Sequence, residues 1–353
     1  MKKLLCLLLV VALCSVGVYL HGRIAKLFKN EVVVYNWSDY IPQEVLNDFT
    51  KETGINVIYS TYESNESMFS KLQLLGNGGH GYDIVVPSTY YISMLREKDL
   101  IQELQLSTIS NIKYIDKRFL DQDYDKGNRY SVPYMWGALG ILVNTDYIDE
   151  EISSWADLDN PKYAGKLLLS DDVRDLFGVA LKIQGLSPNT MEEEDLRQAQ
   201  IWLAKLKPRT RVFTTQVKQP FSGDEVHIGM AWNGDALVIM EEKPEIKFVW
   251  PKEGTLIWVD NFVLLKGAPN PDNAYTFINY MLRPDVAAKC VQEYMYSTPN
   301  TEALALLPEE LTGNRVFMPT EADLAGSDAV LDVGAAMRLY SDYWEKLLHS
   351  STP

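Results

Sequence analysis

The chain has 353 residues, of which 46% are hydrophobic, and a formal net charge of -15 at neutral pH. This length and composition are sufficient for a globular protein with a sizeable core and about two domains. The acidity argues against nucleic acid as a partner, because nucleic-acid-binding proteins need basic patches.

The N-terminus predicts export from the cytoplasm. Two lysines precede an apolar run over residues 4–20, so residues 1–23 are typical of a signal peptide or a membrane anchor. Cys14 lies where the cysteine of a lipoprotein processing site would lie, and a lipid on Cys14 would then hold the protein at the membrane. An uncleaved anchor and cleavage near Gly17 are the alternatives. All three predict a domain in the periplasm.

The chain then alternates expected strands and helices. Three consecutive valines in 31–35 indicate a strand that is covered on both faces. Pro42 favours the start of a helix, and Gly54 follows its end. Further strands are expected over 55–60 and 83–87, and the next helix over 66–75. Together these elements form a βαβαβ unit.

A second α/β unit follows, and the C-terminal third is expected to be helical. The expected strands are 140–144, 166–170, 228–232 and a segment from 262 to 265; the expected helices are 172–184, 236–241 and 271–282, the last with Asn270 as its cap. Cys290 lies in a helical pattern and is expected to be a buried, inert thiol. The fold class is therefore α/β, with a cleft between two units.

Acidic and aromatic residues recur together at the ends of these elements. A carboxylate and an aromatic face both attract an ammonium group, and the rings also cover a ligand's methylene groups. Because ligands of open α/β sheets bind beyond the carboxyl ends of the strands, these segments predict a binding site for a flexible organic cation. They are residues 37–40, 88–91, 171–175, 232–235 and 258–260.

Enzymatic and metal-dependent functions have less support. Asp171, Asp172 or Asp260 could form the carboxylate pair of a glycoside hydrolase, but the spacing of such a pair across two units does not follow from the sequence. The four histidines are scattered, and the glycine-rich segment 76–81 lacks the lysine of a phosphate-binding loop. We therefore expect a protein that is not an enzyme, without cofactor or metal.

Six motifs in order make the chain resemble the polyamine-binding proteins of ABC importers, from about residue 31 to the C-terminus. The motifs are Tyr35-Asn36-Trp37-Ser38-Asp39-Tyr40, Tyr62-Glu63-Ser64-Asn65-Glu66, Val86-Pro87-Ser88-Thr89-Tyr90-Tyr91, Ser154-Trp155-Ala156-Asp157-Leu158, Trp232-Asn233-Gly234 and Val249-Trp250-Pro251-Lys252-Glu253-Gly254. The resemblance implies the two-lobe periplasmic-binding fold of type II, with two hinge crossovers and a ligand cleft between two mixed α/β lobes. The implied lobes are residues 31–137 plus 260–303 and residues 138–259 plus 304–349.

The resemblance also implies roles for individual residues in polyamine binding. Asp172 has a second interpretation, because it could instead cap the helix that it precedes. Ser88 is expected to hydrogen-bond near one amine, and Ser38 and Asp39 resemble the putrescine-binding branch of the family, where Asp39 adds an acid. The implied aromatic walls are Trp37, Tyr40, Tyr90, Trp232 and Trp258, and the implied amine-binding acids are Asp172, Asp175 and Asp260.

Two departures from the family pattern affect the choice of polyamine. Asp175 stands where spermidine binders have a longer glutamate, and Val330 stands where they place a glutamine on the ligand. We therefore expect putrescine or spermidine as ligand, in no fixed order, and an ABC permease in the inner membrane as partner of a monomeric protein. The alternatives are a protein of this fold that binds another cationic or zwitterionic solute, and a surface-tethered sensor or adhesin.

Overall fold

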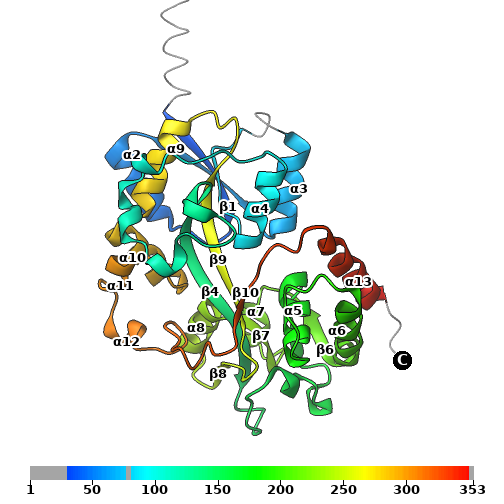
Figure 1. Cartoon of the computed structure of the whole chain (residues 1–353). Coiled ribbons are helices and arrows are strands. Elements are labelled where there is room, and N and C mark those ends of the chain that lie inside the picture. Colours follow the sequence, from blue (N-terminus) through cyan, green and yellow to red (C-terminus); the bar gives the residue numbers. More distant parts are fainter. Residues whose placement is uncertain (1–29, 77–80, 350–353) are drawn as a thin grey trace, which may run out of the picture.

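The computed structural model describes residues 30–76 and 81–349 (Figure 1). The predicted N-terminal export segment, including Cys14, lies outside the described residues. Within the described ranges no helix combines the length and the apolar character that crossing a bilayer requires.

The strands and helices follow one another in the alternating order that the sequence predicts. The strands are β1 (Glu31–Trp37), β2 (Asn56–Tyr62), β3 (Ile84–Val85), β4 (Ser131–Asn144), β5 (Leu167–Leu169), β6 (Thr210–Phe213), β7 (Ile228–Trp232), β8 (Ile246–Val249), β9 (Leu256–Leu264) and β10 (Asp328–Ala329). The α-helices are α2 (Gln43–Thr53), α3 (Asn65–Leu75), α4 (Thr89–Glu97), α5 (Val173–Ile183), α6 (Glu193–Leu206), α7 (Lys218–Ser222), α8 (Asn233–Glu242), α9 (Pro271–Met281), α10 (Pro284–Tyr294), α11 (Thr301–Leu304), α12 (Glu309–Thr312) and α13 (Met337–His349).

The strands form two groups, which we call the first and the second lobe. In the first lobe β2, β1 and β3 are parallel, and β9 pairs with β3 in the antiparallel direction. Val32, Val33 and Val34 of β1 are all buried, as the run of valines predicts for a strand covered on both faces. In the second lobe β6, β5 and β7 are parallel, and β4 runs antiparallel to β7 and β8.

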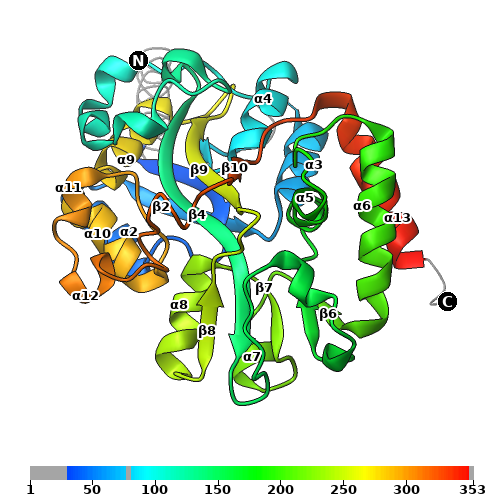
Figure 2. The same ribbon diagram turned by 60° about the horizontal axis from the view of Figure 1, so that its bottom comes forward.

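Two long strands connect the lobes. The first half of β4 pairs with β9, and its second half pairs with β7 and β8, so one continuous strand belongs to both lobes. Figure 1 shows β4 and β9 running side by side from one lobe to the other. These strands are the two crossovers that the sequence predicts. The C-terminal segment packs on the second lobe, because β10 pairs with the start of β9 and α13 packs against α5 and α6 (Figure 2).

Three local details differ from the expectations. Helix α2 begins at Gln43, with Pro42 just before it, while Gly54 ends the helix at a left-handed φ of 72°. Strand β4 starts at Ser131, well before residue 140. It continues through Pro133, with a shift of its register against β9 between Pro133 and Met135. Asn270 precedes α9 without capping it.

The reason for this last difference is a buried carboxylate. The backbone N–H of Asn270 donates to Asp83 Oδ1 at 2.6 Å, and its side-chain Nδ2 donates to Asp83 Oδ2 at 3.2 Å. Asp83 therefore fixes the start of α9 beside the β1–β3 sheet. Cys290 is buried in α10 as predicted, and burial raises the pKa of its thiol to about 12.

Candidate functional site

Asp260 is the centre of a buried cluster in the first lobe. It lies on β9 and is 4% exposed. The Tyr40 hydroxyl donates to Asp260 Oδ2 at 2.7 Å, and the Ser88 hydroxyl donates to Asp260 Oδ1 at 2.6 Å. Tyr40 follows β1 and Ser88 follows β3, so the carboxyl ends of two parallel strands deliver both donors, as the sequence predicts.

The charge of Asp260 has no cationic partner in this cluster. Burial raises the pKa of its carboxyl to about 7, and the hydrogen bonds from Ser88 and Tyr40 oppose the shift. In the described part of the chain the salt bridges do not include Asp260. A carboxylate in this setting is stabilised by any cation that enters the site.

A second acidic cluster lies at the start of α5 in the second lobe. Asp172 caps the helix, since its Oδ1 accepts from the backbone N–H of Arg174 at 2.8 Å and of Asp175 at 3.0 Å. Asp175 is buried in the first turn, and the Trp232 indole Nε1 donates to its Oδ2 at 2.9 Å. Burial raises the pKa of both acids, that of Asp175 well above its usual range, with the Asp172 charge as the second cause for Asp175.

Three of the expected aromatic residues, Tyr40, Trp232 and Trp258, form with Tyr296 a connected wall between the two acidic clusters. The rings of Trp232 and Trp258 lie edge to face, with 6.4 Å between their centroids, and Tyr296 lies 5.2 Å from Trp258 and 5.9 Å from Tyr40. Trp232 comes from the second lobe and Tyr40 from the first. The wall therefore crosses the boundary between the lobes.

A glycine makes room for one of these rings. Gly137 of β4 is the register partner of Trp258, and a Cβ atom on Gly137 would lie 2.6 Å from Trp258 Cζ2. The same Cβ would lie 2.7 Å from Asn233 Oδ1, so any larger residue must displace the indole and Asn233. The same spacing argument applies to Gly234, whose Cβ would lie 2.3 Å from Tyr296 Cδ1.

This packing predicts the effect of Gly137→Ala. We expect the displaced Trp258 to lower polyamine affinity by about tenfold, with a loss of stability of about 1–3 kcal/mol from overpacking. Calorimetric titration and thermal melting measure the two effects. Gly140→Ala is the matched control, because its Cβ would overlap Phe248 at 2.1 Å, away from the site. Equal affinities for the two variants would show that Trp258 does not line the site.

Two further predicted residues, Trp37 and Tyr90, also lie in the first lobe. The Trp37 indole Nε1 donates to the Val86 carbonyl at 2.9 Å, which fixes the ring against the loop after β3. Tyr90 is 5% exposed, and its hydroxyl accepts from Asn65 Nδ2 at 3.2 Å. The same Nδ2 donates to the Ser88 hydroxyl at 3.0 Å, so Asn65 positions both site residues.

Ser38 and Asp39 lie apart from the Asp260 cluster. The Ser38 hydroxyl donates to Glu63 Oε1 at 2.8 Å, and Asp39 is exposed in a turn with a φ of 50°. Asp39 instead lies near Asp235 of α8, because its charge contributes to raising the Asp235 pKa to about 6, after the main effect of burial. Asp235 also has a side-chain hydrogen bond with Tyr296, which opposes the rise of its pKa and connects Asp235 to the aromatic wall.

Several residues of the site were not assigned from the sequence. Glu66 and Asn65 stand within one of the family motifs, and Asp235 directly follows the Trp232 motif, but none of them received a role. Tyr296 stands outside the motifs, and only the three-dimensional packing against Trp258 reveals it. The signal for Asp235 was its position just after an expected strand.

The Trp232 motif also has a structural role. Asn233 is fully buried; its Oδ1 accepts from the Ala138 backbone N–H at 3.0 Å, and its Nδ2 donates to the Val316 carbonyl at 2.8 Å. Asn233 thus ties the crossover strand β4 to the C-terminal segment directly beside the aromatic wall.

Two lobes joined by crossover strands, with acids and aromatic rings from both lobes at one centre, are the arrangement of a solute-binding protein. Among residues 30–76 and 81–349, no group of histidine, cysteine or acidic side chains is suited to hold a metal ion. The chain belongs to the family described as bacterial extracellular solute-binding proteins, which matches residues 44–316.

Individual relatives agree with this family. The chain is similar to the spermidine/putrescine-binding periplasmic protein of Escherichia coli, with 42% identity over 320 residues that cover 90% of this chain and 91% of the relative. It is 33% identical to the putrescine/agmatine-binding protein of Pseudomonas aeruginosa, over 81% of this chain and 83% of that protein. Its structure is similar to that of a putative spermidine/putrescine ABC transporter protein of Listeria monocytogenes, with a TM-score of 0.86, 34% identity, and coverage of 91% of this chain and 99% of the other.

Proposed function

We propose that the protein captures a polyamine, putrescine or spermidine, between its lobes and delivers it to an ABC-type importer in the inner membrane. The observation that carries this proposal is Asp260, a buried acid with two hydroxyl donors and, among residues 30–76 and 81–349, no cationic partner, next to an aromatic wall that spans both lobes. Relatives whose names give spermidine and putrescine as ligands support it. The family consists of binding proteins for transport, so no chemical change of the ligand is part of this function.

The proposed roles follow the geometry. Asp260 binds one ammonium group, with Ser88 and Tyr40 holding its two carboxylate oxygens in place. Asp172 and Asp175 bind a second ammonium group; both backbone bonds of Asp172 use Oδ1, which leaves Oδ2 to face a ligand. Trp37, Tyr90, Trp232 and Trp258 cover the methylene groups, at about 0.8 kcal/mol for each buried CH₂.

Specificity arises from the distance between the acids. An aliphatic diamine or triamine fits only where its ammonium spacing matches the spacing of the carboxylates, since an unmatched charge would be buried without a partner. Ser38 and Asp39 are proposed to act at the edge of the site, beside Asp235. Val330 is buried at the end of β10, where it offers an apolar contact instead of a hydrogen bond.

Closure of the lobes is the proposed signal to the importer. We propose that residues 31–137 plus 260–303 and residues 138–259 plus 304–349 move as two bodies about β4 and β9. A ligand that touches both bodies favours the closed arrangement, and the permease then recognises the surface that closure creates. We further propose a monomer in the periplasm, held at the membrane through residues 1–23, with a lipid on Cys14 or an uncleaved helix.

Calorimetric titration tests this function directly. Residues 24–353 are titrated with putrescine, cadaverine, spermidine and spermine at low and moderate salt. We expect micromolar or tighter binding that weakens with salt and that differs among the four spacings. Absence of heat with all four ligands, on a folded and ligand-stripped sample, would contradict the proposal and favour another cationic solute.

A further inference from the structure

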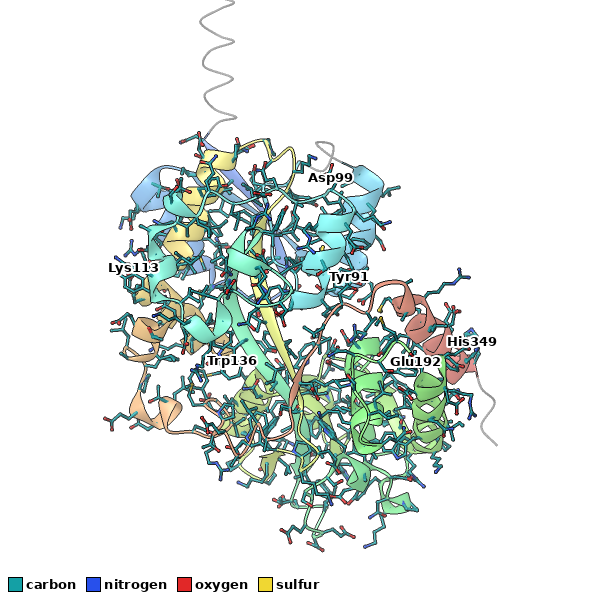
Figure 3. All side chains as sticks on the ribbon, in the orientation of Figure 1. Tyr91, Asp99, Lys113, Trp136, Glu192 and His349 are labelled. Atoms are coloured by element: carbon teal, nitrogen blue, oxygen red, sulfur yellow. The ribbon has the colours of Figure 1, made fainter. Side chains whose placement is uncertain are left out.

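Glu66 lies in the first lobe on the side that faces the second lobe. It is the second residue of α3, and its Oε1 accepts a hydrogen bond from the Tyr91 hydroxyl of α4 at 3.1 Å. Tyr91 lies where the two lobes meet (Figure 3). The hydrogen bond therefore holds the Glu66 carboxylate at the lobe boundary.

A row of side chains leads from Glu66 to the acids of the second lobe. The Tyr91 ring lies 4.8 Å from the Tyr90 ring, and the Arg174 guanidinium of α5 lies over Tyr90 at 5.4 Å from its centroid. Arg174 directly precedes Asp175 and follows Asp172 by two residues. Glu66 therefore lies opposite the start of α5, with an acid from one lobe facing two acids from the other.

Arg174 offsets these three acids only in part: its charge lowers the pKa of each of them, but it is a single positive charge. Its guanidinium donates to the Leu331 carbonyl at 2.9 Å and to Asn189 Oδ1 at 2.8 Å, which turns the donors toward the C-terminal segment. In the part of the chain that the structure describes, the salt bridges do not include Glu66, Asp172 or Asp175. Without a ligand this boundary therefore holds more acidic groups than the single Arg174 charge can offset.

We propose that Glu66 is a third carboxylate of the amine subsite formed by Asp172 and Asp175, supplied by the opposite lobe, so that one ammonium group bridges the two lobes. This inference rests on the proposed polyamine function. In this arrangement the lobes close stably only when the ligand brings a second ammonium group. Without a cation the three carboxylates repel one another, and a cation between them draws them together. A monoamine bound at Asp260 alone leaves this repulsion in place.

The electrostatics of Glu66 support the same arrangement. Burial raises the pKa of Glu66 to about 7, and the charge of Asp172 is the second cause. The facing groups that titrate or carry charge are Tyr90, Tyr91 and Arg174 besides the two aspartates. A bound ammonium lowers the pKa of Glu66 again, so binding near neutral pH releases protons from this group.

The test compares Glu66→Gln with Glu97→Gln in residues 24–353. The glutamine Oε1 still accepts from Tyr91, so only the charge is lost, while Glu97 is an exposed acid at the end of α4. We expect Glu66→Gln to weaken putrescine and spermidine binding by about tenfold, and Glu97→Gln by less than about twofold. Titration in buffers of different ionisation enthalpy should show fewer protons released by Glu66→Gln than by the wild type.

Two results would overturn the inference about Glu66. One is an unchanged affinity of Glu66→Gln in a wild-type background that binds polyamines. The other is a loss of affinity together with a lower melting temperature of the unliganded variant, since removal of a repelled charge should not destabilise the empty protein. A wild-type protein that binds no polyamine would instead overturn the proposed function.

Discussion

Replacing Asp260 with asparagine is expected to weaken polyamine binding by about 100-fold or more, because the ammonium group would be buried without its carboxylate partner. Asparagine keeps the shape of the side chain: its Oδ1 accepts from one of the two hydroxyls, and its Nδ2 donates to the other, whose oxygen then acts as the acceptor. The empty variant should therefore melt at least as high as the wild type at pH 8. Calorimetric titration gives the affinity, and thermal melting gives the stability.

The comparison variant for Asp260 is Asp39→Asn. Asp39 is exposed, so its interaction with a cation is screened by water, and we expect a loss of only about threefold. Equal losses for the two variants, or no loss for Asp260→Asn, would contradict the assignment of Asp260 as the central amine-binding acid.

Polyamine affinity is expected to fall by at least about tenfold for each pH unit below 7, or at least about 100-fold between pH 7 and pH 5. The reason is that the empty site binds a proton at Asp260, whose pKa is about 7, and the ligand must displace that proton. The tyrosines that face Asp260 do not titrate in this range, because burial raises the pKa of Tyr40, Tyr62 and Tyr296. Aliphatic ammonium groups, similar to that of lysine, stay charged throughout.

The stability of the empty protein should change with pH in the opposite direction. The folded pKa of Asp260 lies above the value of about 3.9 that an unfolded aspartate has, so its contribution to stability is complete below pH 4 and is lost as the pH rises through 7. The increase in melting temperature on adding ligand should therefore be larger at pH 8 than at pH 5. If the ligand raised the melting temperature equally at pH 5 and pH 8, at matched ionic strength, Asp260 would not be the group that exchanges its proton for the ligand.

The origin of these raised pKa values is common to both lobes. Burial is the first cause for Asp260, Asp172, Asp175, Glu66 and Asp235, and each lies beside aromatic rings or other acids. A site that keeps several acids away from water is unfavourable unless a cation enters. The same arrangement that costs stability in the empty protein therefore provides affinity for an organic cation.

The sequence by itself determined the order of the elements and the composition of the site. Local backbone preferences and the alternation of strands and helices can be recognised within a short segment of the chain. Examples are the valine run of β1, the glycine after α2, and the position of Tyr40 and Ser88 at the ends of strands. Long-range order is not needed to recognise them. The resemblance to the polyamine-binding family likewise predicted Asp172, Asp175 and Asp260 as the amine-binding acids.

Only the tertiary structure decided which of these residues meet. The register of β4 against β9 places Trp258 opposite Gly137, and strand pairing of this kind depends on residues that are more than one hundred positions apart. The same holds for Tyr296, which reaches the aromatic wall from the C-terminal part of the chain, and for Glu66, which faces the start of α5 only when the two lobes come together. Burial, and with it the shifted pKa values, is a property of that assembled arrangement, because desolvation depends on every segment that covers a carboxylate.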